Sequence, residues 1–107
     1  MTDSEDLPAW ALDVLDLVEE IPPGHVMTYG DIARILHIPS PRHVGYVMSH
    51  YGREVPWHRE VRSDGSLVQH QHDRHSQLLN DEDTPMRGNR VDLSKARWSP
   101  PTSPPTD

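Results

Sequence analysis

One short stretch of this 107-residue sequence, Val55–Arg59, presents three side chains of different chemistry directly after a proline. Pro56 fixes its own φ and has no N–H, so it constrains the backbone that carries the indole of Trp57, the imidazole of His58 and the guanidinium of Arg59. Taken alone, such a stretch is more typical of a buried Trp beside two solvated neighbours. The chain has no cysteine, which excludes disulfides, thiolate metal sites and a Cys nucleophile.

Three further motifs accompany this stretch: Thr28–Ala33 and Arg42–Gly45 before it, and Ser63–Gly65 after it. Each motif is weak alone, but their combination and order are specific. A later group of histidines at positions 70, 72 and 75 suggests a metal site. Three imidazoles without a carboxylate or thiol in an established spacing are weak evidence, so we expect no metal and no cofactor.

The first half of the chain must position the early motifs on helices. Apolar residues recur at three- and four-residue spacing after Pro8 and predict an amphipathic helix that ends before 22–24. Thr28 is expected to cap a second short helix, which Pro39 ends, and Ser40 with Pro41 opens a third. Two short helices around a Pro-containing turn are typical of a helix-turn-helix, whose second helix is the candidate recognition element.

The second half predicts a small β wing. The apolar residues around the Asp-Gly pair of Ser63–Gly65 favour a hairpin over 61–68, and 69–83 is expected to form a final short helix. Residues 84–93 read as a loop or a late strand, and Trp98 is expected to dock the C-terminus. The fold class is therefore mainly α with a small β wing, a winged helix-turn-helix.

We expect one domain over residues 8–98, between a disordered N-terminus, 1–7, and a disordered Pro-rich tail, 99–107. No apolar run approaches membrane-spanning length, and the chain starts with an acidic segment rather than a signal peptide. These features predict a soluble, monomeric, intracellular protein that is cytoplasmic, and nucleoid-associated if prokaryotic.

The charge is distributed unevenly along the chain. The formal net charge of −7 argues against a nucleic-acid partner if it is taken whole. Residues 1–31, however, hold eight acidic side chains and no Lys or Arg, whereas 32–62 hold five Arg and four His against two Glu. A local excess of positive charge is what phosphate binding needs, although the asymmetry could also be ordinary surface solvation.

In this order the four motifs resemble the DNA-binding domain of O⁶-alkylguanine-DNA alkyltransferases, over roughly residues 9 to 98. The central motif of that family reads Pro-Cys-His-Arg, and its Cys accepts the alkyl group. Trp57 stands at the matching position, as in the alkyltransferase-like proteins, which bind the lesion without repairing it. The resemblance implies an alkyltransferase C-terminal-domain-like fold and a protein that is not an enzyme.

The resemblance also implies roles for the residues that match. Arg42 would enter the duplex through the minor groove and fill the gap left by an extruded nucleotide, which offsets an extrusion cost of a few kcal/mol. Tyr29 would crowd the target phosphate and help to rotate the nucleotide, and Gly45 would let the backbone approach the DNA. Glu82 would hold a hydrogen-bond network behind His58. The expected lesion-pocket residues are Tyr29, Val55, Pro56, Trp57, His58, Arg59, Ser66 and His70.

The implied function is recognition of O⁶-alkylguanine in double-stranded DNA, with base flipping and marking of the lesion for nucleotide excision repair proteins. Direct alkyl transfer requires a strong nucleophile, ordinarily a thiolate, and an indole cannot replace it. Three alternatives stay open. They are a winged-helix DNA-binding regulator without lesion specificity, a metal-dependent hydrolase that uses the histidines, and an interaction module that does not bind DNA.

Overall fold

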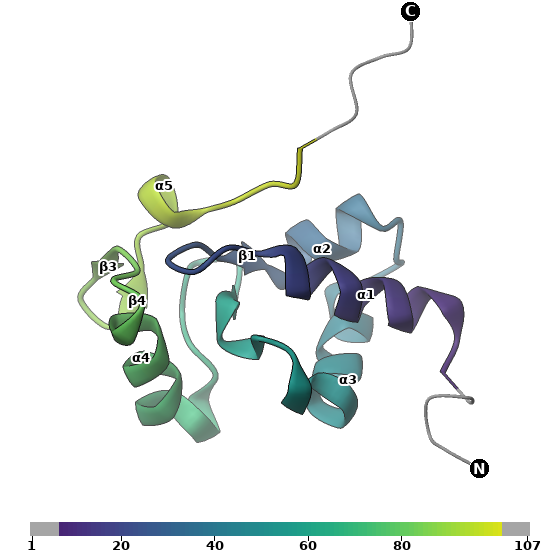
Figure 1. Ribbon diagram of the computed structural model, residues 1–107, viewed down its shortest axis with the longest axis horizontal. Coiled ribbons are helices and arrows are strands. Elements are labelled where there is room, and N and C mark those ends of the chain that lie inside the picture. Colours follow the sequence, from purple (N-terminus) through teal and green to yellow (C-terminus); the bar gives the residue numbers. More distant parts are fainter. Residues whose placement is uncertain (1–6, 102–107) are drawn as a thin grey trace, which may run out of the picture.

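A computed structural model describes residues 7–101, whose first half is a group of three packed helices (Figure 1). These helices are α1 (Ala9–Glu20), α2 (Tyr29–Ile35) and α3 (Pro41–Tyr51). They enclose a core of fully buried aliphatic side chains that includes Val14, Val18, Ile32, Val44 and Val47. No helix within 7–101 is long and apolar enough to cross a bilayer. The disorder expected of 1–7 and 99–107 falls mostly outside the described residues.

The predicted helix-turn-helix is formed by α2 and α3. Thr28 caps α2 through a capping box, since its hydroxyl accepts from the Asp31 N–H while the Asp31 carboxylate accepts from the Thr28 N–H. The helix ends before Pro39: His37 takes a left-handed φ of 58°, and the Ile38 N–H donates to the Ala33 carbonyl. Ser40 then caps α3 as predicted, with Pro41 in the first turn.

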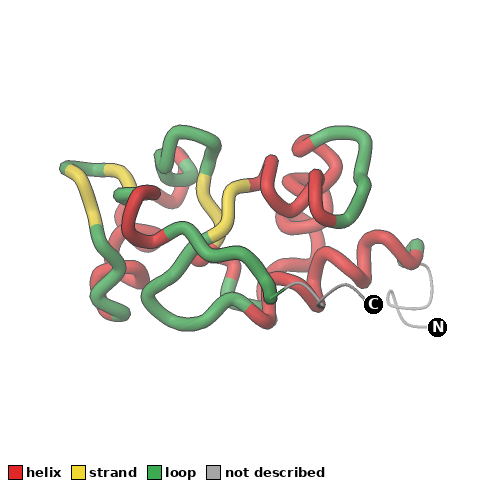
Figure 2. The backbone as a smooth tube through the Cα atoms, turned by 90° about the horizontal axis from the view of Figure 1, so that it is seen from above, coloured by secondary structure: helices red, strands yellow, loops and turns green. Residues whose placement is uncertain are grey.

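Two short parallel strands join the helical half to the central motif. Strand β1 (Met27–Thr28) pairs with β2 (Glu60–Val61), with Met27 opposite Glu60. On the other side of β1, Val26 forms a bridge with Arg97, and the Trp98 N–H donates to the Val26 carbonyl at 2.8 Å. The strands lie between the two halves in Figure 2. Trp98 therefore docks the C-terminal segment, as predicted.

The second half consists of short elements around a smaller core. Short 3₁₀ turns, η2 (Gly52–Glu54), η3 (Trp57–Arg59) and η4 (Gln69–Gln71), lead to α4 (His72–Asp81). The strands β3 (Met86–Arg87) and β4 (Arg90–Val91) and the helix α5 (Leu93–Ala96) follow. Their core consists of Val26, Val61, Leu67, Leu79, Val91 and Ala96.

The wing differs in position from the sequence prediction. Residues 61–68 form no hairpin: Val61 ends β2 and pairs with Thr28 of β1, and the Arg62 N–H donates to the Ser66 carbonyl across a turn in which Gly65 has a φ of 86°. The antiparallel hairpin is β3–β4, joined by Gly88 and Asn89. The Val91 N–H donates to the Gly65 carbonyl, so the turn is held by β4 rather than by a strand of its own. Nor is α4 the final helix, since α5 follows it.

Candidate functional site

The outer face of α3 carries the candidate finger, Arg42. Its side chain is exposed and has no hydrogen-bond or ion-pair partner within residues 7–101, while its backbone N–H is held by the Ser40 hydroxyl at 3.1 Å. Gly45 lies one turn further along, and a Cβ there would meet no atom of residues 7–101 within 4 Å beyond its chain neighbours and its own helix backbone. The packing within these residues therefore does not require glycine at this position. A mid-helix glycine costs about 1 kcal/mol relative to alanine, so a need outside the chain would explain it.

Tyr29 occupies the first position of α2 and is half-buried. Burial raises the pKa of its hydroxyl, and the nearby Glu60 carboxyl raises this pKa further, so Tyr29 stays a neutral hydrogen-bonding group. A residue far away in the sequence holds the first turn of α2: Arg97 donates to both Asp31 carboxylate oxygens, at 2.9 and 2.6 Å. Burial opposes ionisation of Asp31, but the hydrogen bonds from Arg97 and Thr28 outweigh it and lower the pKa of this carboxyl.

Trp57 is presented by a tight turn. Pro56 has φ −74° and ψ 69°, and the Trp57 N–H donates to the Val55 carbonyl at 2.7 Å, which is an inverse γ-turn. The indole is partly exposed and lies against the ring of His75, with centroids 5.2 Å apart. It also meets the ring of His58 edge-on at 6.2 Å. Part of the indole is therefore packed against these two rings, while part of the side chain remains accessible.

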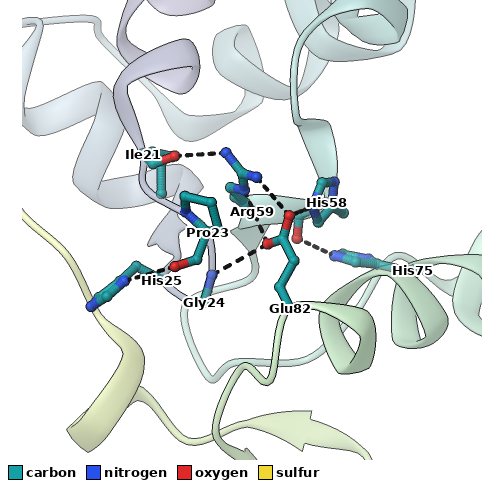
Figure 3. A network of polar contacts seen from close by, with 8 residues as sticks. All are labelled: Ile21, Pro23, Gly24, His25, His58, Arg59, His75 and Glu82. Carbon is teal, nitrogen blue, oxygen red and sulfur yellow. Dashed lines mark hydrogen bonds and ion pairs between the residues drawn. The ribbon is translucent and has the colours of Figure 1, made fainter.

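Behind this turn, His58 and Arg59 converge on the Glu82 carboxylate (Figure 3). His58 Nε2 lies 2.9 Å from Glu82 Oε2, and Arg59 binds both carboxylate oxygens, at 3.1 and 2.6 Å. Arg59 Nη1 also donates to the Ile21 carbonyl at 2.8 Å, just past the end of α1. The Gly24 N–H donates to Glu82 Oε1 at 3.3 Å. The predicted network behind His58 is therefore present, and Arg59 is part of it.

The Glu82 carboxylate is held in its charged form. Burial opposes ionisation, but the hydrogen bonds from Arg59, His58 and the Gly24 N–H outweigh it and lower the pKa of Glu82 to about 2. Glu82 caps the C-terminus of α4, where Asp83 takes a φ of 58° and the Thr84 N–H donates to the Leu79 carbonyl. This cap fixes where the carboxylate lies relative to the Trp57 turn.

The segment after β2 is held at three points. The Ser66 N–H donates to Asp64 Oδ1 at 2.9 Å, the Gly65 carbonyl accepts from Val91, and the Val68 N–H donates to His75 Nδ1 at 3.2 Å. Ser66 is half-buried, whereas His70 is exposed. The backbone of this segment is therefore ordered by the chain itself, and the side chain of His70 lies on its outer surface.

The three later histidines do not come together. His75 is fully buried and His70 is exposed, and within residues 7–101 no group of three or more His, Asp or Glu side chains is arranged to hold a metal ion. Two open hollows, of about 420 and 490 Å³, lie elsewhere on the surface. Of the predicted lesion-pocket residues, only Val55 lines one of these two hollows, and neither is lined by Tyr29 or Trp57, so the lesion pocket stays a prediction.

Site residues whose partners are distant were not identified from the sequence. His75 packs behind Trp57 and shares a face of α4 with the buried Leu79 four residues later, a helical spacing that could have revealed it. Glu60 stands where the related alkyltransferases usually have a hydrophobic residue. It lies in β2 and is fully buried, and both its carboxyl oxygens are unpartnered within 7–101. No sequence signal indicates the pairing of Arg97 with Asp31.

Comparison with known proteins gives matches over most of this architecture. Residues 9–84 match the family described as "6-O-methylguanine DNA methyltransferase, DNA binding domain". The alkyltransferase-like protein 1 of Schizosaccharomyces pombe is 51% identical over 57 residues, which are 50% of this chain and 53%, about half, of that protein. A DNA base-flipping protein of Escherichia coli is 37% identical over 92 residues, 80% of this chain and 71% of that protein.

The solved structures agree with these relatives. A crystal structure of S. pombe Atl1 in complex with damaged DNA containing O6-carboxymethylguanine matches with a TM-score of 0.75 and 32% identity, over 94% of this chain and 100% of that one. A second structure of the S. pombe protein in complex with DNA matches with a TM-score of 0.74. The expected mainly helical fold with a small wing is thereby confirmed. Because the family match covers most of the chain, and the base-flipping relative is matched over more than two thirds of its length, the chain belongs to the family of the 6-O-methylguanine DNA methyltransferase DNA-binding domain.

Proposed function

We propose that this protein recognises O⁶-alkylguanine in double-stranded DNA, flips the base out through the minor groove and holds it without repairing it. The observation that carries this proposal is the combination of a family fold, seen in a relative bound to damaged DNA, with the Trp57 turn and with Arg42, whose side chain is unpaired within residues 7–101. Tyr29 supports it with a neutral hydroxyl at the start of α2. Gly45 supports it because the packing within residues 7–101 does not require a glycine there.

Arg42 is the residue that takes the place of the flipped nucleotide. A planar guanidinium can stack between bases and donate hydrogen bonds, which offsets an extrusion cost of a few kcal/mol. No carboxylate within residues 7–101 competes for the Arg42 side chain. Gly45, one turn away, leaves room for the helix to approach the sugar–phosphate backbone.

The pocket for the extruded base is formed by Tyr29, by the turn from Val55 to Arg59, and by Ser66 and His70. Trp57 supplies an apolar surface there for the alkyl group or the base face. No alkyl transfer occurs, since the chain has no cysteine and an indole N–H is not a useful nucleophile. The His58–Glu82 pair, which has no thiol to activate, keeps the turn in place instead.

A lesion that is bound but not repaired must be removed by another system. We therefore assign the complex a marking role, in which a monomer on the lesion is recognised by nucleotide excision repair proteins. In this role the protein would act in the cell compartment that contains the DNA.

The test compares affinities for one duplex with guanine or O⁶-methylguanine at a single position, measured by fluorescence anisotropy at several salt concentrations. We expect tighter binding to the modified duplex. Trp57→Ala should lower the ratio of the two affinities and leave the salt slope unchanged, since the indole contacts no phosphate. Arg53→Ala, at an exposed position in η2, should flatten the slope and preserve the ratio. Equal affinities of the wild type for both duplexes would favour a winged-helix regulator and overturn the proposal.

A further inference from the structure

His75 has no role in the function proposed above, yet it is the histidine most completely enclosed by the fold. Its side chain is fully buried on the inner face of α4, one turn before Leu79. Its Nε2 lies 2.9 Å from the His58 carbonyl oxygen, and its Nδ1 lies 3.2 Å from the Val68 backbone nitrogen. Figure 3 shows the ring pointing from α4 to the backbone at His58.

The two backbone partners fix the protonation of the ring. The Val68 N–H can only donate, so Nδ1 must present a lone pair. The His58 carbonyl can only accept, so Nε2 must carry the proton. The ring is therefore neutral and in a single tautomer. Burial lowers the pKa of His75 to about 4, and the nearby charges of His58 and His72 act in the same direction, whereas its hydrogen bond to the His58 backbone opposes this shift.

These contacts connect the two backbone segments that carry most of the candidate pocket. His58 belongs to the turn that presents Trp57, and Val68 belongs to the segment that carries Ser66 and His70. The same ring lies 5.2 Å from the indole of Trp57, centroid to centroid. A single side chain thus determines the spacing of two pocket walls and supports the side chain between them.

From this geometry we infer that His75 is a positioning residue for lesion recognition: its neutral ring holds the Trp57 turn and the segment around Val68 at the spacing that accepts an extruded base. This inference rests on the proposed function. An apolar side chain of similar size could fill the same space, but it would leave a part-buried N–H and a buried carbonyl without the partners that His75 supplies. Packing alone therefore does not account for a histidine here.

Two amide variants separate the two contacts. The side-chain oxygen of Asn in His75→Asn can take the place of Nδ1 and accept from Val68, whereas the amide nitrogen of Gln in His75→Gln can take the place of Nε2 and donate to His58. His75→Leu removes both contacts and keeps the burial. Gln77→Ala, at an exposed position of α4, is the matched control. Each variant is measured as the full chain on the paired guanine and O⁶-methylguanine duplexes, together with backbone amide exchange by NMR.

We expect His75→Leu to lower the modified-to-unmodified affinity ratio at least about tenfold while the unmodified affinity and its salt slope stay unchanged. His75→Asn and His75→Gln should each retain part of the ratio, and Gln77→Ala all of it. In the free protein, the Val68 amide should stay protected from exchange in His75→Asn and exchange faster in His75→Gln. Nitrogen shifts of wild-type His75 should report the Nε2–H tautomer.

The outcomes that overturn the inference are distinct from those that overturn the function. If the wild type prefers the modified duplex and the Asn and Gln variants keep the full ratio, His75 is only a packing residue. The same conclusion follows if Val68 exchange is equal in these two variants, and this holds even where His75→Leu fails to fold. A wild type without preference overturns the proposed function and the positioning role with it, whatever the exchange data show.

Discussion

Glu60 should be a costly residue for this fold, and its replacement by methionine should stabilise the protein. Its side chain is fully buried in β2 opposite Met27, and neither carboxyl oxygen has a hydrogen-bond partner within residues 7–101. Burial raises the pKa of Glu60 well above its usual value. Methionine is similar in length, adapts to irregular spaces and carries no group that needs a hydrogen bond. Glu60→Met therefore removes the cost and retains the packing.

The expected gain follows from the price of a buried polar group without a partner, which is about 1–3 kcal/mol even for a neutral group. For a domain of this size, each kcal/mol raises the melting temperature by about 4–8 °C. Urea unfolding followed by circular dichroism at several pH values gives the free energy of unfolding of both proteins. Glu54→Met, at an exposed position in η2, is the control and should change little.

The pH dependence provides the sharper test. Because the pKa of Glu60 is raised by folding, the folded protein holds a proton that the unfolded chain has released above its ordinary pKa of 4.5. Wild-type stability relative to Glu60→Met should therefore fall as the pH rises from there, by up to about 1.4 kcal/mol per pH unit. His75 and Glu82 titrate in both proteins, so their contributions cancel in the difference. A difference that does not change between pH 5 and 8 would show that the carboxyl is solvated or paired, and would refute the reasoning.

The other predictions concern the functional site. Incubation with DNA that carries a radiolabelled O⁶-methyl group should leave the label on the DNA. Stoichiometric label on the protein would contradict the claim that no alkyl group is transferred with Trp57 in place of the acceptor cysteine. Arg42→Ala should weaken binding to the modified duplex by a few kcal/mol. Arg42→Lys should recover only part of this affinity, since lysine restores the charge without the planar guanidinium. Full recovery would show that Arg42 is only a phosphate contact. Glu82→Gln should destabilise the fold by about 2 kcal/mol, since it leaves Arg59 and His58 without a charged partner. Because folding lowers the pKa of Glu82, its stabilisation is present above pH 4.5 and is lost as the pH falls towards 2, which acid unfolding of the two proteins would show.

The helical half of the fold could be predicted from the sequence because its signals are local. The spacing of Val14 and Val18, the Thr28 cap and the Ser40-Pro41 pair each act within one or two helical turns, and all three are found in the structure. The end of α2 differs in cause, since a left-handed His37 terminates the helix before Pro39 is reached. Proline marked the boundary correctly, but the hydrogen bonds that close the helix come from the residues before it.

The second half could not be predicted as well, because its geometry depends on contacts across the chain. Asp64-Gly65 is a strong local hairpin signal, yet its turn is held by Val91, a residue that sequence reasoning cannot place beside it. A Cβ at Gly65 would lie 2.5 Å from the Val91 carbonyl oxygen, so this glycine serves the close approach as well as the turn. His75 was missed for a similar reason, since its partners are backbone groups 7 and 17 residues away.

The charge distribution indicates how such a protein could prefer a lesion to ordinary DNA. Of the five Arg in 32–62, Arg59 is occupied by Glu82 and Arg34 lies 3.5 Å from the Asp31 carboxylate. The proposed function inserts Arg42 into the base stack, which leaves Arg53 and Arg62 exposed for phosphates. Two phosphate contacts give a salt slope of only about −2, so this segment contributes little sequence-independent affinity. The net charge of −7 lowers that affinity further. Contacts to an extruded base release few counterions. The preference for the lesion should therefore persist at salt concentrations at which binding to unmodified duplexes has largely been lost.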